Sequence, residues 1–376
     1  MRLSAHWRYA ILLFVVSQAA LSILGTLARQ AFDAAGGPPA GETMMRADQD
    51  AVSSHGWYSM WFAWDSFQYR NLAEVPWGQW EHLGFPLLYP VLAKALAVPL
   101  GGDTELALLL IADAAYIVLL AYLYRWSLLV LGESADDEAA RRTARLLVLM
   151  PTAFLFHAAL TEALFVCLAV VAFYHAERGQ WIAAGVAGYF LALSRSVGFL
   201  VVIPLVLLLV TRSGRRFEPK ALALVLVPAG WLTFMAYSRW RVGDWFAYQE
   251  EQRRGWGIEL TDPLWTLWHG VSAGTPLDRT RTWFAVAVLA LAVAGAWRLH
   301  PAYAVYTVVL VLAALSIGVP VYRSLLRYLL VAFPLAAVLA RWTVRREVET
   351  ALTALLAVTQ GALFVLWLAY WTHTII

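Results

Sequence analysis

Residues 10–27 read AILLFVVSQAALSILGTL and carry no charged side chain. Crossing the hydrocarbon core of a bilayer takes about 20 mostly apolar residues in helical form, so this stretch is close to the required length. It is longer than the apolar core of a signal peptide, and no convincing cleavage site follows it. We therefore expect a membrane helix that is retained in the mature protein.

Comparable apolar runs recur to the end of the chain. Of the 376 residues, 61% are hydrophobic and 14% charged, which lies outside the range of soluble domains. The 19 Trp and 16 Tyr suit the aromatic belts at membrane surfaces. The pattern predicts helices at roughly 9–28, 105–131, 146–157, 161–176, 182–194, 197–211, 221–241, 283–298, 302–319, 326–341 and 351–371. We expect an all-α polytopic membrane protein with about 9–11 transmembrane helices, forming a single domain over residues 1–376.

Basic residues predict how the chain is oriented. One set of short links carries most of them: Arg2, Arg8, Arg141, Arg142, Arg145, Arg212, Arg215, Arg216, Lys220, Arg298, Arg341, Arg345 and Arg346. Because Lys and Arg accumulate in cytoplasmic loops, we expect a cytoplasmic N-terminus and two outer loops, 29–104 and 242–282. Within the first outer loop, residues 91–100 predict a helix lying in the interface, with Lys94 reaching toward the headgroups.

Two segments, 146–177 and 182–211, are too short for two full spans each. With about thirty residues, each is either one long tilted helix or a pair of short helices. Polar interruptions at Pro151, Thr161-Glu162 and Ser194-Arg195-Ser196 favour the pairs. Broken backbone at membrane depth is tolerated where it lines a cavity, so the pairs predict the floor of a pocket.

Ionisable residues in apolar segments are functional candidates because burying them in a membrane is costly. They are Asp113, Glu162, Arg195, Arg323 and Arg327. One interpretation is a set of ion pairs that fasten helices together. The other is an arginine cluster that binds a lipid phosphate, with Asp113 and Glu162 orienting the arginines or contacting sugar hydroxyls.

Asp65 lies in a polar, aromatic-rich loop between apolar segments. There a carboxylate can accept a proton from a substrate at the membrane face, or can cap a helix that starts near Ser66. Three of the eight histidines, His55, His82 and His157, lack metal-site spacing, and no Asp-x-Asp pair lies near Asp65, so no metal or other cofactor is predicted. His157 and the single cysteine, Cys167, lie in apolar runs and are expected in the core.

Six blocks in the order of one known family give the chain a specific resemblance. They are WDSFQYRNLAE at 64–74, FPLLYP at 85–90, residues 151–165 with Thr161-Glu162, SRSVG at 194–198, GDWFAY at 243–248 with Gln252 and Trp256, and Arg327-Tyr328 with Phe333-Pro334. Together they resemble PIG-V-type mannosyltransferases, the family of GPI mannosyltransferase II and its prokaryotic relatives. Two positions depart from that pattern. Gln68 stands where the family has His, which puts a proton-relay role there in doubt, and Val197 stands where it has Asn.

The resemblance implies a GT-C glycosyltransferase fold and inverting transfer of mannose from a polyprenyl- or dolichyl-phosphate donor. It implies Asp65 as the catalytic base, with Arg195, Arg327 and Arg323 binding the donor phosphate. The implied substrate-binding residues are Trp64, Gln68, Tyr69, Tyr89, Asp113, Glu162, Gln252, Trp256 and Tyr328. The acceptor would be a hydroxyl of a lipid, glycan or protein on the outer side, and no nucleic acid is expected as a partner. Composition favours a prokaryotic cell membrane over the endoplasmic reticulum.

Other functions remain open from the sequence. The same fold could move another sugar from a polyprenyl phosphate. A transporter or lipid-binding protein would use the buried charges to line a path, although the sequence shows no repeated half. A catalytically inactive scaffold is a further alternative, which Gln68 favours.

Overall fold

A computed structural model of the chain describes residues 4–36, 58–62, 65–132, 136–213, 218–296 and 298–368. Within these ranges all regular structure is helical and no strand is present. Trp64 and His55, which the sequence singles out, lie outside the described residues.

The α-helices are α1 (Ala5–Ala34), α3 (Asp65–Glu74), α4 (Leu88–Ala97), α5 (Thr104–Val130), α6 (Asp137–Val148), α7 (Glu162–Glu177), α8 (Trp181–Ser194), α9 (Val202–Ser213), α10 (Leu226–Val242), α11 (Ala247–Trp256), α12 (Pro263–Ser272), α13 (Pro276–Ala296), α14 (Pro301–Leu315), α15 (Leu325–Tyr328), α16 (Pro334–Trp342) and α17 (Arg346–Leu368). Short 3₁₀ helices extend or connect them: η1 (Ser59–Trp61), η2 (Val98–Leu100), η4 (Ala153–His157), η5 (Ser196–Val201), η6 (Pro219–Val225), η7 (Val319–Ser324) and η8 (Leu329–Val331).

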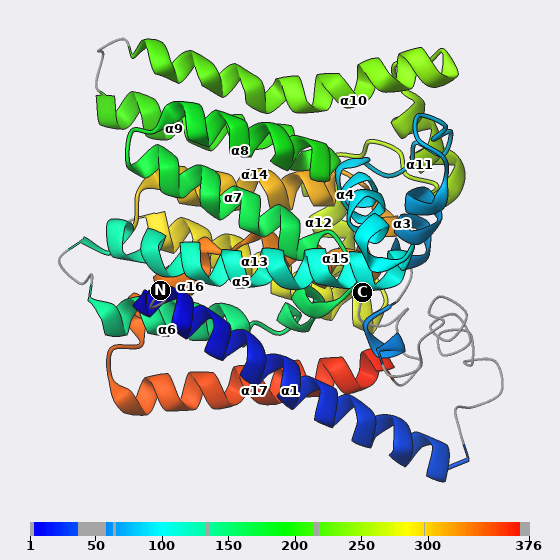
Figure 1. Ribbon diagram of the computed structural model, residues 1–376. Helices are drawn as coiled ribbons and strands as arrows, with labels where there is room; N and C mark the ends of the chain where they lie inside the picture. Colours follow the sequence, from blue (N-terminus) through cyan, green and yellow to red (C-terminus); the bar gives the residue numbers. More distant parts are fainter. Residues whose placement is uncertain are drawn as a thin grey trace.

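The long helices lie side by side in one bundle (Figure 1). α5 is central and packs against α1, α4, α6 and α7, while α8 packs between α7 and α10. α1 and α17 contact each other along the edge opposite α10. Helices α3, α4 and α11, which belong to the two long loops, gather at one end of the bundle, and the first turns of α6 and α17 and the start of the helix Pro219–Val242 lie at the other (Figure 1).

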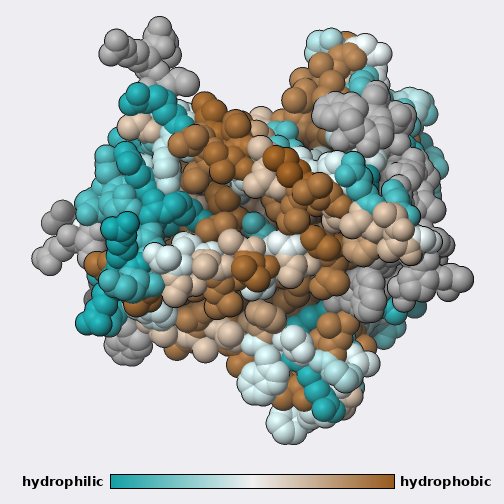
Figure 2. Space-filling view, turned by 90° about the horizontal axis from the view of Figure 1, so that it is seen from below, coloured by the Kyte–Doolittle hydropathy of each residue, from teal (hydrophilic) through white to brown (hydrophobic). Residues whose placement is uncertain are grey.

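Four helices have the length and apolar composition to cross a membrane alone: α1, α5, α17 and the continuous helix Pro219–Val242. A fifth candidate is the pair Val319–Val331 and Pro334–Trp342, bent by 67°. Over the described residues, these four or five candidates are fewer than the expected 9–11 transmembrane helices. The reason is that Trp181–Ser194, Ser196–Arg212 and Pro301–Leu315 are apolar but shorter than a full span. Figure 2 shows a broad apolar surface across the middle of the molecule beside a hydrophilic end, which fits a multi-pass membrane protein.

Prolines explain two helices that the apolar pattern placed wrongly. Instead of a helix over 146–157, α6 ends at Val148, a turn contains Pro151, and η4 follows. Instead of a continuous helix over 326–341, the chain breaks after Val331 and α16 begins with Pro334. Proline lacks the N–H that a preceding turn requires, so it starts a helix readily but does not continue one.

The 182–211 segment is a pair of short helices, as the sequence favoured. α8 ends at Ser194, Arg195 has extended backbone with φ −152° and ψ 146°, and η5 folds back over the last turn of α8. Gly198 permits this close approach, because a Cβ there would lie 2.4 Å from the carbonyl oxygen of Leu191. The break therefore presents the Arg195 side chain at the junction of two helices.

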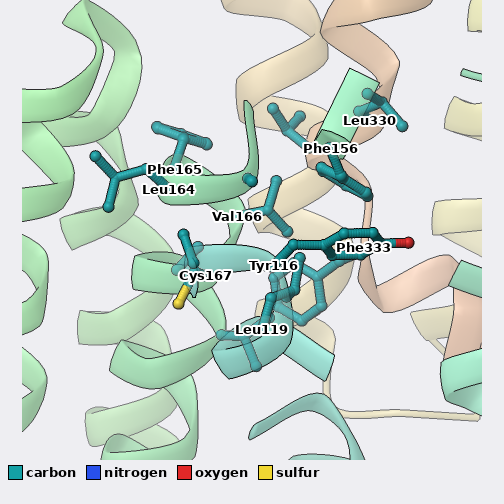
Figure 3. Packing of buried hydrophobic residues seen from close by; sticks show 14 of the residues in the cluster. Tyr116, Leu119, Phe156, Leu164, Phe165, Val166, Cys167, Leu330 and Phe333 are labelled. Atoms are coloured by element: carbon teal, nitrogen blue, oxygen red, sulfur yellow. The ribbon is translucent and has the colours of Figure 1, made fainter. Parts of the chain in front are cut away.

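The buried core is shared by α5, α7 and the segment before α16, and Figure 3 shows Tyr116 and Phe333 packed within it. Cys167 is buried there as a free thiol. His157 is buried among aromatic rings and bonds the Ser17 hydroxyl through Nε2 at 2.9 Å. Both residues belong to the core, as predicted.

The two long loops carry more helix than the sequence indicates. In the first, α4 and η2 cover the stretch expected to lie in the interface. The ammonium of Lys94 donates to the carbonyl oxygen of Ala73 at 3.1 Å and lies 5.5 Å from the ring centre of Trp77. This contact fastens α4 to the end of α3. In the second loop, α11 and α12 form helices that the apolar pattern did not indicate.

Candidate active site

Asp65 is the first residue of α3, so the helix starts at the carboxylate itself. The adjacent Ser66 hydroxyl donates to the carbonyl oxygen of Ala159 at 2.9 Å. The amide of Ala159 in turn donates to the carbonyl oxygen of Trp61 at 2.9 Å. These contacts dock the start of α3 onto the irregular segment between η4 and α7, and so bring Asp65 close to the start of α7.

Four charged side chains form a continuous series of ion pairs. Arg327 of α15 donates from Nη1 to Oδ2 of Asp65 at 2.6 Å and from Nε to Oε1 of Glu162. Arg195, at the α8–η5 break, donates from Nη1 to the same Oε1 at 2.5 Å. Glu162 is the first residue of α7, so the series joins the first long loop to three segments of the bundle.

Burial explains why these charges occur in pairs. The side chains of Glu162 and Arg327 are only 2% and 6% exposed, and isolated charges at such depth would be very costly. The other oxygen of Glu162, Oε2, is buried with no hydrogen-bond partner. Asp65 is 24% exposed, so its carboxylate remains open to solvent despite the ion pair.

A cavity of about 1260 Å³ opens in front of this series. Eight predicted site residues line it: Asp65, Tyr69, Arg195, Gln252, Trp256, Arg323, Arg327 and Tyr328. The residues of the α8–η5 break, 194–196, also line it, so the helix break forms part of a pocket as the sequence predicts. Apolar side chains of η5 and α14, among them Leu200 and Leu310, complete the wall.

Arg323 differs from Arg195 and Arg327, which line the same cavity. It lies in η7, is exposed, and contacts no carboxylate in the part of the chain that the structure describes. Arg195 is held over the ring of Tyr328, with 5.5 Å between the guanidinium carbon and the ring centre. Among the described residues, Arg323 thus has no carboxylate partner, whereas Arg195 and Arg327 share Glu162.

Helix α11 covers part of the cavity and is held there by three contacts. The Tyr248 hydroxyl donates to the Ser196 hydroxyl at 3.0 Å, next to Arg195. Gln252 Nε2 donates to the carbonyl oxygen of Gly84 at 2.7 Å, and the Trp256 ring meets that of Phe85 edge-on at 5.5 Å. Burial raises the pKa of Tyr248 to about 12, so its hydroxyl stays protonated near neutral pH. Sequence reasoning did not select Tyr248, although it lies within the 243–248 block.

Four predicted site residues lie outside the cavity wall. Glu162 is behind the arginines, bonded to both. Tyr89 donates to the carbonyl oxygen of Leu108 at 2.8 Å, and its ring meets Tyr69 edge-on at 5.1 Å, so it supports a lining residue. Asp113 lies in α5 with Oδ1 buried and unpartnered. Gln68 is half-buried on α3.

Across the described ranges, no group of three or more His, Cys, Asp and Glu side chains is placed to hold a metal ion. The positive charge that the cavity presents comes from guanidinium groups.

Comparison with known proteins gives one finding on family. A family model described as Mannosyltransferase (PIG-V) matches residues 9–224. That range contains Asp65, Glu162 and Arg195, whereas Arg323, Arg327 and α11 lie beyond its end. No curated protein matches the chain.

Proposed function

The chain belongs to the mannosyltransferase (PIG-V) family and is a membrane glycosyltransferase, and on this premise we propose that it transfers mannose from a polyprenyl- or dolichyl-phosphate donor to an acceptor hydroxyl. The observation that carries the proposal is the place in the cavity wall where the Asp65 carboxylate lies beside the ion-paired Arg327, with Arg195 and Arg323 lining the same cavity. A base for the acceptor and a clamp for the phosphate are the two components that this reaction needs.

The charges of the cavity suit the charge that develops during transfer. A sugar-phosphate diester carries one negative charge, and the released monoester carries about two near pH 7. Arg195 and Arg327 are held by Glu162 in fixed positions, and Arg323 adds an uncompensated positive charge. Preorganised donors of this kind favour the transition state, where the phosphate oxygen takes up negative charge.

Asp65 would act as the general base. As the acceptor oxygen forms its bond to the anomeric carbon, its proton passes to the Asp65 carboxylate. The bond from that carbon to the phosphate oxygen breaks, and its electron pair leaves with the lipid phosphate. Attack from the face opposite the phosphate inverts the anomeric configuration. A donor phosphate that engages Arg327 would loosen the Asp65–Arg327 ion pair and leave the carboxylate open to the acceptor.

We place this chemistry on the outer side of the membrane. The cavity lies at the end of the bundle that carries α3, α4 and α11, opposite the arginine-rich links (Figure 1). The proposed acceptor is a hydroxyl of a lipid, glycan or protein, and the proposed location is a prokaryotic cell membrane.

Replacement of Asp65 tests the proposal. Purified Asp65→Asn, reconstituted with polyprenyl-phosphate mannose and a membrane-lipid acceptor fraction, should lose about 10²–10⁴-fold in transfer rate, the usual contribution of a general base. The matched control is Asp244→Asn, because Asp244 also lines the cavity but accepts a hydrogen bond from the amide of Phe246. It should transfer mannose at close to the wild-type rate. Wild-type turnover by Asp65→Asn would remove Asp65 from the mechanism. A panel of polyprenyl phosphates bearing other sugars tests the choice of mannose.

A further inference from the structure

Helix α12, in the second long loop, has its apolar side chains on the outside. Leu264 and Trp268 are 63% and 70% exposed, and Trp265 between them is also exposed. The fully buried positions of the helix are Thr266 and Gly270, and the apolar Leu267 is partly buried beside them. A helix packed on a protein surface in water shows the opposite arrangement, with its apolar face inward.

The buried side of α12 is fixed by specific contacts. The Tyr322 hydroxyl donates to the carbonyl oxygen of Thr266 at 2.5 Å, and His269 Nδ1 lies 3.3 Å from the same hydroxyl. A Cβ on Gly270 would lie 2.3 Å from the hydroxyl oxygen of Thr282 in α13, so the helices meet closely there. The outward face is therefore a stable feature of the fold and not a consequence of loose packing.

We propose that the outward face of α12, formed by Leu264, Trp265 and Trp268, lies in the membrane interface and contacts lipid. With ten residues α12 is about 15 Å long, half of what a span needs, so it lies on the bilayer and does not cross it. Tryptophan suits this depth because its ring is apolar while its N–H remains near water. His269 is the only ionisable side chain of the helix, and it is turned toward Tyr322.

The surroundings of α12 favour lipid over another occupant. α12 packs against α13 and α14, and the amide of Thr261 just before it donates to the carbonyl oxygen of Ser316, just after α14, at 2.9 Å. α14 is an apolar helix, and α13 continues the exposed apolar surface with Trp283. The α12 face is thus continuous with the side of the bundle that a bilayer would cover.

Contact of α12 with lipid would also determine how deep in the membrane the cavity lies. Leu260 lines the cavity and is 92% exposed, only four residues before Leu264. With α12 in the interface, this edge of the cavity meets the lipid headgroups, so a membrane-dissolved molecule could enter it sideways.

Spin labelling tests the proposal without any substrate. The full-length protein carrying Cys167→Ala and Trp268→Cys is labelled and reconstituted in nanodiscs of phosphatidylcholine and phosphatidylglycerol. We expect the label to collide more often with dissolved oxygen than with a water-soluble nickel chelate. Leu264→Cys gives a second position on the same face. The control is Arg254→Cys on α11, at an exposed side chain of the cavity rim, where the nickel chelate should dominate.

Two results would overturn the assignment. Nickel accessibility at positions 264 and 268 equal to that at 254 would place α12 in water. Exclusion of both reagents would show that protein covers the face, and spin–spin broadening in that case would identify a second copy of the chain.

Discussion

Arg323 and Arg327 are four residues apart, yet their surroundings differ. Arg327 is buried between Asp65 and Glu162, and removing it would leave two carboxylates facing each other. Arg323 is exposed on the cavity wall and, within the described residues, contacts no carboxylate. A substitution at Arg323 should therefore report on substrate binding alone, whereas one at Arg327 also disturbs the fold.

We expect Arg323→Ala to raise the donor KM about 10- to 150-fold, since hydrogen bonds to charged groups contribute about 1.5–3 kcal/mol. kcat and the melting temperature should change little. Steady-state kinetics with varied donor concentration checks this. Arg254→Ala is the control, because Arg254 lines the same cavity but pairs with Glu250 at 2.6 Å and should leave the donor KM unchanged. An unchanged donor KM in Arg323→Ala would exclude Arg323 from donor binding.

Most of the site residues that the sequence predicted line the cavity, but the sequence did not show which of them contact one another. Glu162 contacts Arg195 and Arg327, which are 33 and 165 residues away along the chain. No local sequence pattern predicts these contacts, because they depend on where the α8–η5 break and the short helix α15 come together in the fold. Both interpretations of the buried charges, structural ion pairs and a phosphate clamp, apply to the same arginines.

At the level of elements, α11 connects the second long loop to the α8–η5 break. The Tyr248 hydroxyl donates a hydrogen bond to Ser196 of the break, next to Arg195. We therefore expect Tyr248 to act as a positioning residue for Arg195.

We expect Tyr248→Phe to raise the donor KM about 2- to 12-fold, since one neutral hydrogen bond contributes about 0.5–1.5 kcal/mol. Ser196→Ala should cost the same, and the double variant no more than either one, because a single interaction is lost. The pKa of Tyr248, raised to about 12 by burial, keeps the hydroxyl protonated below that pH. The effect should therefore be constant between about pH 6 and 9. Additive losses in the double variant would contradict the assignment.

The long apolar helices could be predicted from hydropathy, whereas α11 and α12 could not. Each has ten residues, and their polar and aromatic side chains follow no single apolar period. Prolines also shift helix boundaries. The expected helix over 146–157 is divided around Pro151, because proline interrupts a helix and hydropathy alone does not detect this.

For the whole molecule, the arginine-rich end predicts which side of the membrane the cavity faces. In spheroplasts of a Cys167→Ala background, a membrane-impermeant maleimide should label Arg254→Cys on α11. It should label Lys220→Cys, which is exposed at the opposite end of the bundle, only after permeabilisation. The reverse pattern would place the cavity in the cytoplasm and would contradict the proposed outer location of transfer.

The series Asp65–Arg327–Glu162–Arg195 has no net charge, and with Arg323 these five side chains carry a single positive charge, which the proposed diester would neutralise. In the proposed mechanism Asp65 would hold a proton after transfer, and the site would carry one more positive charge when the carrier lipid carries one more negative charge. The spent carrier would then be retained until Asp65 gives its proton to water. Release of that proton and departure of the carrier would thus be coupled, which would return the enzyme to its starting state.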